Sequence, residues 1–89
     1  MTDIVPAADG AIEVLVPQWG MGMSEATVIT WLVTEGGHVE AGADIVEIEA
    51  EKSEDTIKAP VAGILETIIV SAGETAAVRD VLARIRPVS

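Results

Sequence analysis

One lysine stands out as a candidate for chemistry. The chain has two lysines, and Lys52 is surrounded by acids whereas Lys58 lies between two apolar residues on an expected strand. A Schiff-base or general-base lysine needs a desolvated or cationic environment, and an exposed acidic segment is the opposite. The pattern therefore predicts an amine that another enzyme modifies. We expect that enzyme and the partner proteins to recognise the residues that flank the lysine, which are Glu49, Glu51, Ser53, Glu54 and Asp55.

A cation site is a second interpretation of the acidic segment, and a catalytic base is a second interpretation of His38. The spacing of the acids is not that of a calcium loop, and no glycine within the segment makes the bend such a loop needs. His38 follows two glycines and has no serine, cysteine or second histidine nearby in the sequence. We interpret the acidic segment as a solvated surface that partner proteins recognise, and His38 as a residue of a surface turn. We therefore expect neither a metal site nor a catalytic residue.

Composition limits what the chain can do. With 89 residues it has room for one domain, and without Phe, Tyr or Cys its core must consist of Val, Ile, Leu and Ala. The net charge of -10 opposes binding to nucleic acid or to anionic membranes. No apolar run approaches the roughly 20 residues of a membrane-spanning helix, and no signal peptide is recognisable. We expect a cytoplasmic protein.

Short apolar runs broken by glycines predict strands rather than helices. They cover residues 12–16, 28–33, 45–48, 57–59, 64–70 and 81–85. Residues 1–11 show no periodicity and are interpreted as a flexible leader. The domain is expected over residues 12–86, with residues 87–89 as the start of a linker or tail.

An internal repeat determines the predicted architecture. A shift of 37 positions superposes two sets of residues: Thr30, Val33, Gly36, Ile45 and Ile48 on Thr67, Val70, Gly73, Leu82 and Ile85. In both copies the long strand departs from strict alternation at the same place, which predicts a β-bulge in each. Two such units would bury their apolar faces against each other. The expected fold is all-β: a flattened barrel-sandwich of two antiparallel sheets, each of roughly four strands, with pseudo-twofold symmetry.

Symmetry also predicts where the candidate lysine lies. The segment from Glu47 to Lys58 joins the last strand of one copy to the first strand of the other. It should therefore form a hairpin whose tip carries Glu51, Lys52 and Ser53. No Asn-Gly or Asp-Gly pair marks the turn, so the repeat makes this argument and turn chemistry does not.

Four motifs stand out together: VPQWGMGMSE at 16–25, WLVTEG at 31–36, EIEAEKS at 47–53 and APVAG at 59–63. In this combination the chain resembles, from about Val14 to Ile85, the lipoyl domains of acyltransferase components of 2-oxo acid and acetoin dehydrogenase complexes. The family usually has Glu-Thr-Asp-Lys-Ala around its modified lysine, where this chain has Glu-Ala-Glu-Lys-Ser. That departure leaves the parent complex open.

The resemblance implies a lipoyl carrier domain with lipoic acid in amide linkage to Lys52. A lipoate ligase or lipoyl transferase would attach it. A thiamine-diphosphate-dependent decarboxylase, or dehydrogenase, would acylate the arm, an acyltransferase catalytic domain would pass the acyl group on, and dihydrolipoyl dehydrogenase would reoxidise the dithiol. The domain itself would not be an enzyme, although it would belong to an acyltransferase chain.

Two other functions stay open at this point, a biotin carboxyl carrier domain and an unmodified barrel-sandwich interaction module. Biotin carriers place their lysine between methionines, which Glu51 and Ser53 do not supply. The loop with Trp19, Met21 and Met23 has two interpretations. It either plugs one end of the sandwich, since methionine fills irregular gaps, or forms a recognition surface near the modified turn.

Overall fold

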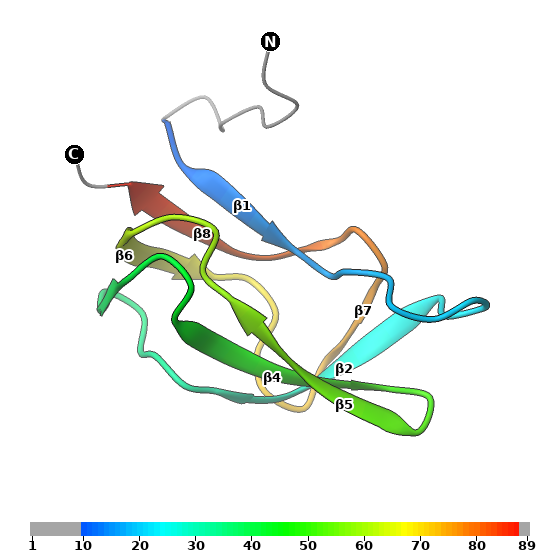
Figure 1. The fold of residues 1–89 in the computed structure, drawn as a ribbon. Helices are drawn as coiled ribbons and strands as arrows, with labels where there is room; N and C mark the ends of the chain where they lie inside the picture. Colours follow the sequence, from blue (N-terminus) through cyan, green and yellow to red (C-terminus); the bar gives the residue numbers. More distant parts are fainter. Residues whose placement is uncertain (1–9, 88–89) are drawn as a thin grey trace, which may run out of the picture.

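The computed structural model describes residues 10–87, which form eight strands and no helix. The strands are β1 (Ile12–Leu15), β2 (Glu25–Trp31), β3 (His38–Val39), β4 (Asp44–Ala50), β5 (Ser53–Lys58), β6 (Gly63–Ile68), β7 (Thr75–Ala77) and β8 (Val81–Pro87). They build two antiparallel four-stranded sheets, in the orders β1-β8-β6-β3 and β5-β4-β2-β7 (Figure 1). Since residues 10–87 contain no helix, none of these residues forms a helix that could cross a membrane.

The two sheets are related by the pseudo-twofold that the repeat predicts. The first sheet becomes the second when β1, β8, β6 and β3 are exchanged for β5, β4, β2 and β7. Backbone hydrogen bonds obey the same symmetry: Gly36 N donates to Leu65 O at 2.7 Å, and Gly73 N donates to Val28 O at 2.7 Å. Each copy therefore forms backbone hydrogen bonds with the other, which is why two short β units form a single domain.

Both predicted bulges are present. The pairing of β2 with β4 shifts register between Val28 and Thr30. The pairing of β6 with β8 shifts between Leu65 and Thr67, the same two positions one repeat later. One extra residue in each long strand increases the local twist, so the flat sheets curve toward closure.

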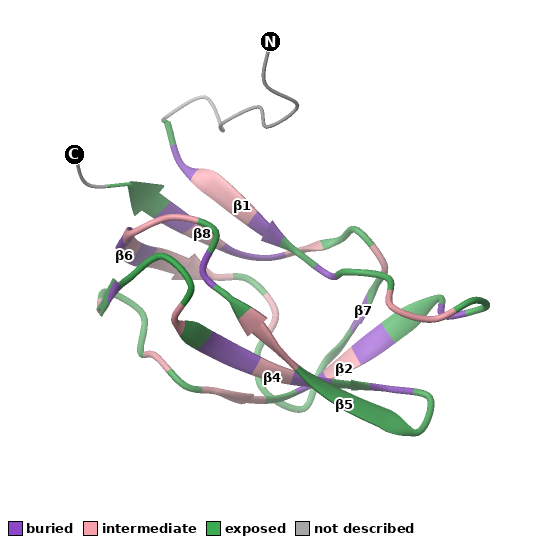
Figure 2. Ribbon diagram, in the orientation of Figure 1, coloured by how far each residue is buried: buried purple, intermediate pink, exposed green. Residues whose placement is uncertain are grey.

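The core lies between the sheets and is aliphatic, as the composition predicts. Its largest fully buried side chains belong to β2, β4, β6, β8 and the residue after β1: Val16, Val28, Ile45, Val46, Ile48, Leu65, Leu82 and Ile85. Trp19 and Trp31 pack against this cluster only partly buried. Burial alternates along β4 from Val46 to Ala50, whereas β5 is exposed over its first half (Figure 2). The tip of that hairpin therefore stands clear of the core.

Some expected boundaries differ from those observed. β2 and β5 begin at Glu25 and Ser53, earlier than predicted, and β3 and β7 were not predicted. The first three residues of β5 are all polar and exposed, and the start of β2 has a single small apolar residue, Ala26, so neither shows a clear alternation. Strands of two or three residues have too short a pattern to detect. Ala11, assigned to the expected leader, is fully buried. Pro87, assigned to the expected tail, ends β8. The rest of the leader, residues 1–9, and residues 88–89 lie outside the described residues.

Candidate functional site

The candidate site is the turn between β4 and β5. Ala50 pairs with Ser53, so Glu51 and Lys52 are the two central residues of a two-residue hairpin turn. This confirms the hairpin predicted from the repeat. Glu51 has a φ of 57°, in the left-handed region that tight hairpin turns require and that residues with a Cβ adopt only at a cost. The register of the two strands thus holds a residue in a strained conformation immediately before the lysine.

The two lysines have different environments. The ammonium of Lys58, at the end of β5, forms an ion pair with Asp44 Oδ1 at 2.5 Å. Lys52 is exposed and, among residues 10–87, its side chain has no hydrogen bond or ion pair. Its amine is therefore accessible on an exposed turn, whereas the amine of Lys58 is already engaged in an ion pair.

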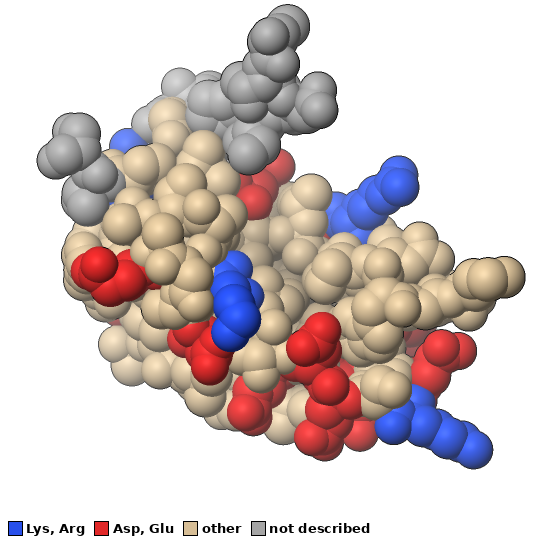
Figure 3. Space-filling view, viewed as in Figure 1, with Lys and Arg blue, Asp and Glu red and all other residues tan. Residues whose placement is uncertain are grey.

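The flanking acids form a surface around this turn. Glu49 of β4 lies directly opposite Glu54 of β5, and both are exposed. Like charges at directly opposed positions destabilise an antiparallel pair by roughly 0.2–1 kcal/mol. Asp55 lies opposite the buried Ile48 and is exposed because β5 is an edge strand. Acidic side chains gather over β4 and β5 in Figure 3.

This acidic surface includes a shallow hollow of about 230 Å³ lined by Glu47, Glu54, Asp55 and Thr56. Asp55 Oδ1 accepts a hydrogen bond from the backbone N–H of Thr56 at 2.8 Å. Within residues 10–87, no three His, Asp or Glu side chains converge as metal ligands would. The arrangement is that of a negatively charged edge, suited to a basic partner surface.

The three large side chains of the loop between β1 and β2, Trp19, Met21 and Met23, differ in their exposure to solvent. Met23 is 4% exposed and belongs to the core, and Trp19 packs against the core from outside. Met21 is 97% exposed. The plug interpretation is therefore correct for Met23, while Met21 is displayed to solvent and its role in recognition remains a prediction.

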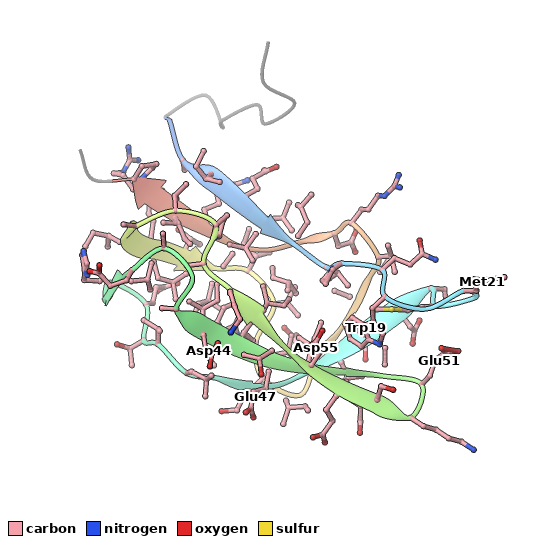
Figure 4. The ribbon with its side chains drawn as sticks, in the orientation of Figure 1. Trp19, Met21, Asp44, Glu47, Glu51 and Asp55 are labelled. Carbon is pink, nitrogen blue, oxygen red and sulfur yellow. The ribbon has the colours of Figure 1, made fainter. Side chains whose placement is uncertain are left out.

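The proximity of this loop to the lysine turn was not predicted from the sequence. A Cβ placed on Gly20 would lie 3.4 Å from Oε2 of Glu51. Figure 4 shows the Glu51 side chain directed from the turn toward the loop that carries Trp19 and Met21. The two segments are separated by three strands in the sequence, and no local pattern of either one marks this proximity.

His38 occupies a surface position, as predicted. It lies in the edge strand β3, is exposed, and its Nδ1 is 3.3 Å from Oε2 of Glu40.

A family model described as biotin-requiring enzyme, which covers biotin and lipoyl attachment domains, matches residues 12–85. Curated relatives include two acetyltransferase components. The dihydrolipoyllysine-residue acetyltransferase component of the acetoin cleaving system of Cupriavidus necator is 35% identical over 97% of this chain and 22% of its own length. The corresponding component of the pyruvate dehydrogenase complex of Mycobacterium bovis is 38% identical over 94% of this chain and 15% of its own length. The chain thus spans less than a quarter of these relatives.

Solved structures that share the fold include a lipoyl domain and a multi-domain carboxylase. The lipoyl domain of the 2-oxoglutarate dehydrogenase complex from Azotobacter vinelandii superposes with a TM-score of 0.71 at 27% identity, over 84% of this chain and 95% of that one. A multi-domain long-chain acyl-CoA carboxylase superposes with a TM-score of 0.77 over 96% of this chain and 8% of that one. Its identity of 24% shows the fold alone. The chain belongs to the biotin/lipoyl attachment family, and within it to the lipoyl domains found in dihydrolipoyllysine acyltransferase components.

Proposed function

We propose that Lys52 carries lipoic acid in amide linkage and that the domain presents this arm to the active sites of a 2-oxo acid or acetoin dehydrogenase complex. The observation that carries the proposal is the placement of Lys52. It is one of the two central residues of a tight turn, exposed, with no side-chain partner among residues 10–87. A free amine on a projecting turn fits a group attached by amide formation, because a modifying enzyme can enclose both the amine and the adjacent backbone.

The dithiolane of the attached group would supply the redox and acyl-transfer chemistry. The domain itself would be non-catalytic, and its contribution would be to hold the arm. A lysine and lipoyl chain reaches roughly 10–15 Å by bond counting. Fusion of the domain to its acyltransferase through a flexible linker would give a millimolar-scale effective concentration at each site.

The modifying enzyme and the catalytic partners would recognise the exposed acidic residues around the turn. Glu49, Glu51, Glu54 and Asp55 stand on the two strands or the turn that hold Lys52, and Ser53 follows it directly. The opposed pair Glu49 and Glu54 is unfavourable for the hairpin itself. A basic partner surface would relieve this repulsion on binding, and the association rate would fall as salt screens it.

The partners that follow from this role are a lipoate ligase or lipoyl transferase, a thiamine-diphosphate-dependent decarboxylase or dehydrogenase, an acyltransferase catalytic domain and dihydrolipoyl dehydrogenase. The relatives' names support an acyltransferase chain of a pyruvate or acetoin complex. A complex of this kind would place the protein in the cytoplasm of a bacterium.

The test uses the two lysines as a matched pair. Lys52→Arg should abolish labelling by lipoate ligase while changing the free energy of unfolding by no more than about 0.5 kcal/mol, because the site is an exposed turn. Lys58→Arg should keep full labelling. A Lys52→Arg chain that unfolds would show that Lys52 is structural, and labelling that persists in it would place the attachment elsewhere.

The same experiment separates the alternatives. Labelling of Lys52 by biotin ligase and not by lipoate ligase would establish a biotin carboxyl carrier. Labelling by neither ligase, together with partner binding independent of Lys52, would establish an unmodified interaction module.

A further inference from the structure

The loop between β1 and β2 carries a surface feature that the carrier role does not use. Gln18, Trp19, Gly20 and Met21 line an open hollow of about 420 Å³. This volume lies within the range of ligand pockets, roughly 300–1,000 Å³. All four lining residues are uncharged, in a chain with a net charge of -10. The hollow therefore suits a neutral, partly apolar group.

The hollow lies beside the lysine turn. Glu51 precedes Lys52 by one residue, about 3.8 Å between Cα atoms. Its side chain points toward the loop (Figure 4), and its Oε2 lies 3.4 Å from the place that a Cβ on Gly20 would occupy. An arm of roughly 10–15 Å attached to Lys52 is comparable in length to one Cα–Cα step plus the Glu51 side chain that spans from the turn toward the loop. It can therefore fold back onto the loop of its own domain.

The loop is held in place. Gln18 Nε2 donates hydrogen bonds to Gly20 O at 3.4 Å and to Met23 O at 3.3 Å, and Met23 N donates to Gly20 O at 3.2 Å. The buried side chain of Met23 anchors the end of the loop in the core. Because these contacts fix the backbone, the loop displays Trp19 and Met21 without a large entropic cost of ordering on binding.

Met21 is the strongest sign that something covers the hollow. Its side chain is 97% exposed, the most exposed large apolar side chain among residues 10–87. The thioether is soft and polarizable, and sulfur makes favourable contacts with aromatic rings at about 5 Å. A dithiolane ring offers sulfur and methylene groups of the same character, and it would bury apolar surface against both Met21 and Trp19.

We infer that the lipoyl arm on Lys52 rests in the hollow formed by Gln18, Trp19, Gly20 and Met21, with its dithiolane ring against Trp19 and Met21. This rests on the function proposed above. Attachment makes docking intramolecular, with a millimolar-scale effective concentration, so an interaction too weak to detect with free lipoamide is populated here. The resting arm exchanges with an extended state that enters partner active sites. No bond is made or broken in docking.

The experiment compares the lipoylated and the unlipoylated chain by NMR, with occupancy of Lys52 measured by mass spectrometry. On lipoylation the Trp19 indole N–H and the Met21 methyl resonances should shift, and the dithiolane protons should show nuclear Overhauser effects to the Met21 methyl group. The Trp31 indole serves as an internal control. Its Nε1 donates to Val70 O at 2.9 Å, in a different part of the fold, so it should not shift.

A matched pair of variants tests the contact itself. Met21→Gln should abolish the lipoylation-dependent shift of Trp19, because it replaces the exposed thioether with a polar amide of similar length. Leu32→Gln, at another exposed apolar residue (47%), should leave that shift intact. Leu32 N bonds to Ile45 O, toward the end of β4 remote from Ala50 and the turn.

The outcomes separate the two proposals. Full lipoylation of Lys52 with unchanged Trp19 and Met21 resonances would overturn docking and leave the carrier function standing. A chain whose Lys52 the ligase leaves unmodified would overturn the carrier function, and docking with it.

Discussion

Substitution of Glu51 tests the geometry that presents Lys52. With a φ of 57°, a residue carrying a Cβ costs the turn about 1 kcal/mol or more relative to glycine. Glycine removes this cost but loses roughly 0.5–1 kcal/mol through the greater freedom of the unfolded chain. Glu51→Ala keeps the Cβ and the strain. Glu51→Gly should therefore be more stable than Glu51→Ala by about 0.5 kcal/mol, or roughly 2–4 °C in Tm for a domain of this size.

Both variants lose the Glu51 carboxylate, so their difference isolates the backbone. Thermal unfolding followed by far-ultraviolet circular dichroism measures it. Asp55 provides the control because it lies in a strand and has no positive φ. There the order should reverse, with Asp55→Gly less stable than Asp55→Ala by roughly 0.5–1 kcal/mol. If Glu51→Gly is the less stable variant at the turn as well, Glu51 is not left-handed and the two-residue turn is wrong.

Four further substitutions probe the fold and the acidic surface. Arg79 has a φ of 76°, and Gly42, the residue at the corresponding position of the other repeat, has a φ of 85°. Chemical denaturation should therefore show that Arg79→Gly is neutral or stabilising, and that Gly42→Ala lowers the free energy of unfolding by about 1 kcal/mol. Gly63→Ala should unfold the domain or cost several kcal/mol, because its Cβ would clash with the backbone of Arg86, and a native-like melting temperature would contradict this packing. Glu54→Lys should raise stability by roughly 0.2–1 kcal/mol while slowing lipoate ligase in a labelling assay, and an unchanged labelling rate would remove Glu54 from the recognition surface.

The repeat made most of the fold predictable. Corresponding apolar positions such as Val28 and Leu65 fix the register of the long strands, so both the bulges and the hairpin between the two copies followed from the sequence. The short strands β3 and β7 did not, because they form only through pairing with strands distant in sequence. Their own residues carry no periodic signal.

The site was predictable to a different degree. The position of Lys52 at the tip of a hairpin followed from symmetry, and its accessibility followed from that position. The proximity of the Glu51 carboxylate to Gly20 was not predicted, because it depends on the tertiary placement of two segments distant in sequence. The separate environments of Met21 and Met23, two residues apart in the same loop, also depend on how the loop folds over the core.

The central claim is that Lys52 is the attachment site of a lipoyl arm. The most direct measurement is intact and tryptic mass spectrometry of the chain after expression with lipoate ligase, and separately with biotin ligase. The account predicts a single lipoyl-amide mass shift, confined to the peptide that contains Lys52 and absent from Lys58. A biotinyl shift alone, a lipoyl shift on Lys58, or no shift with either ligase would contradict it.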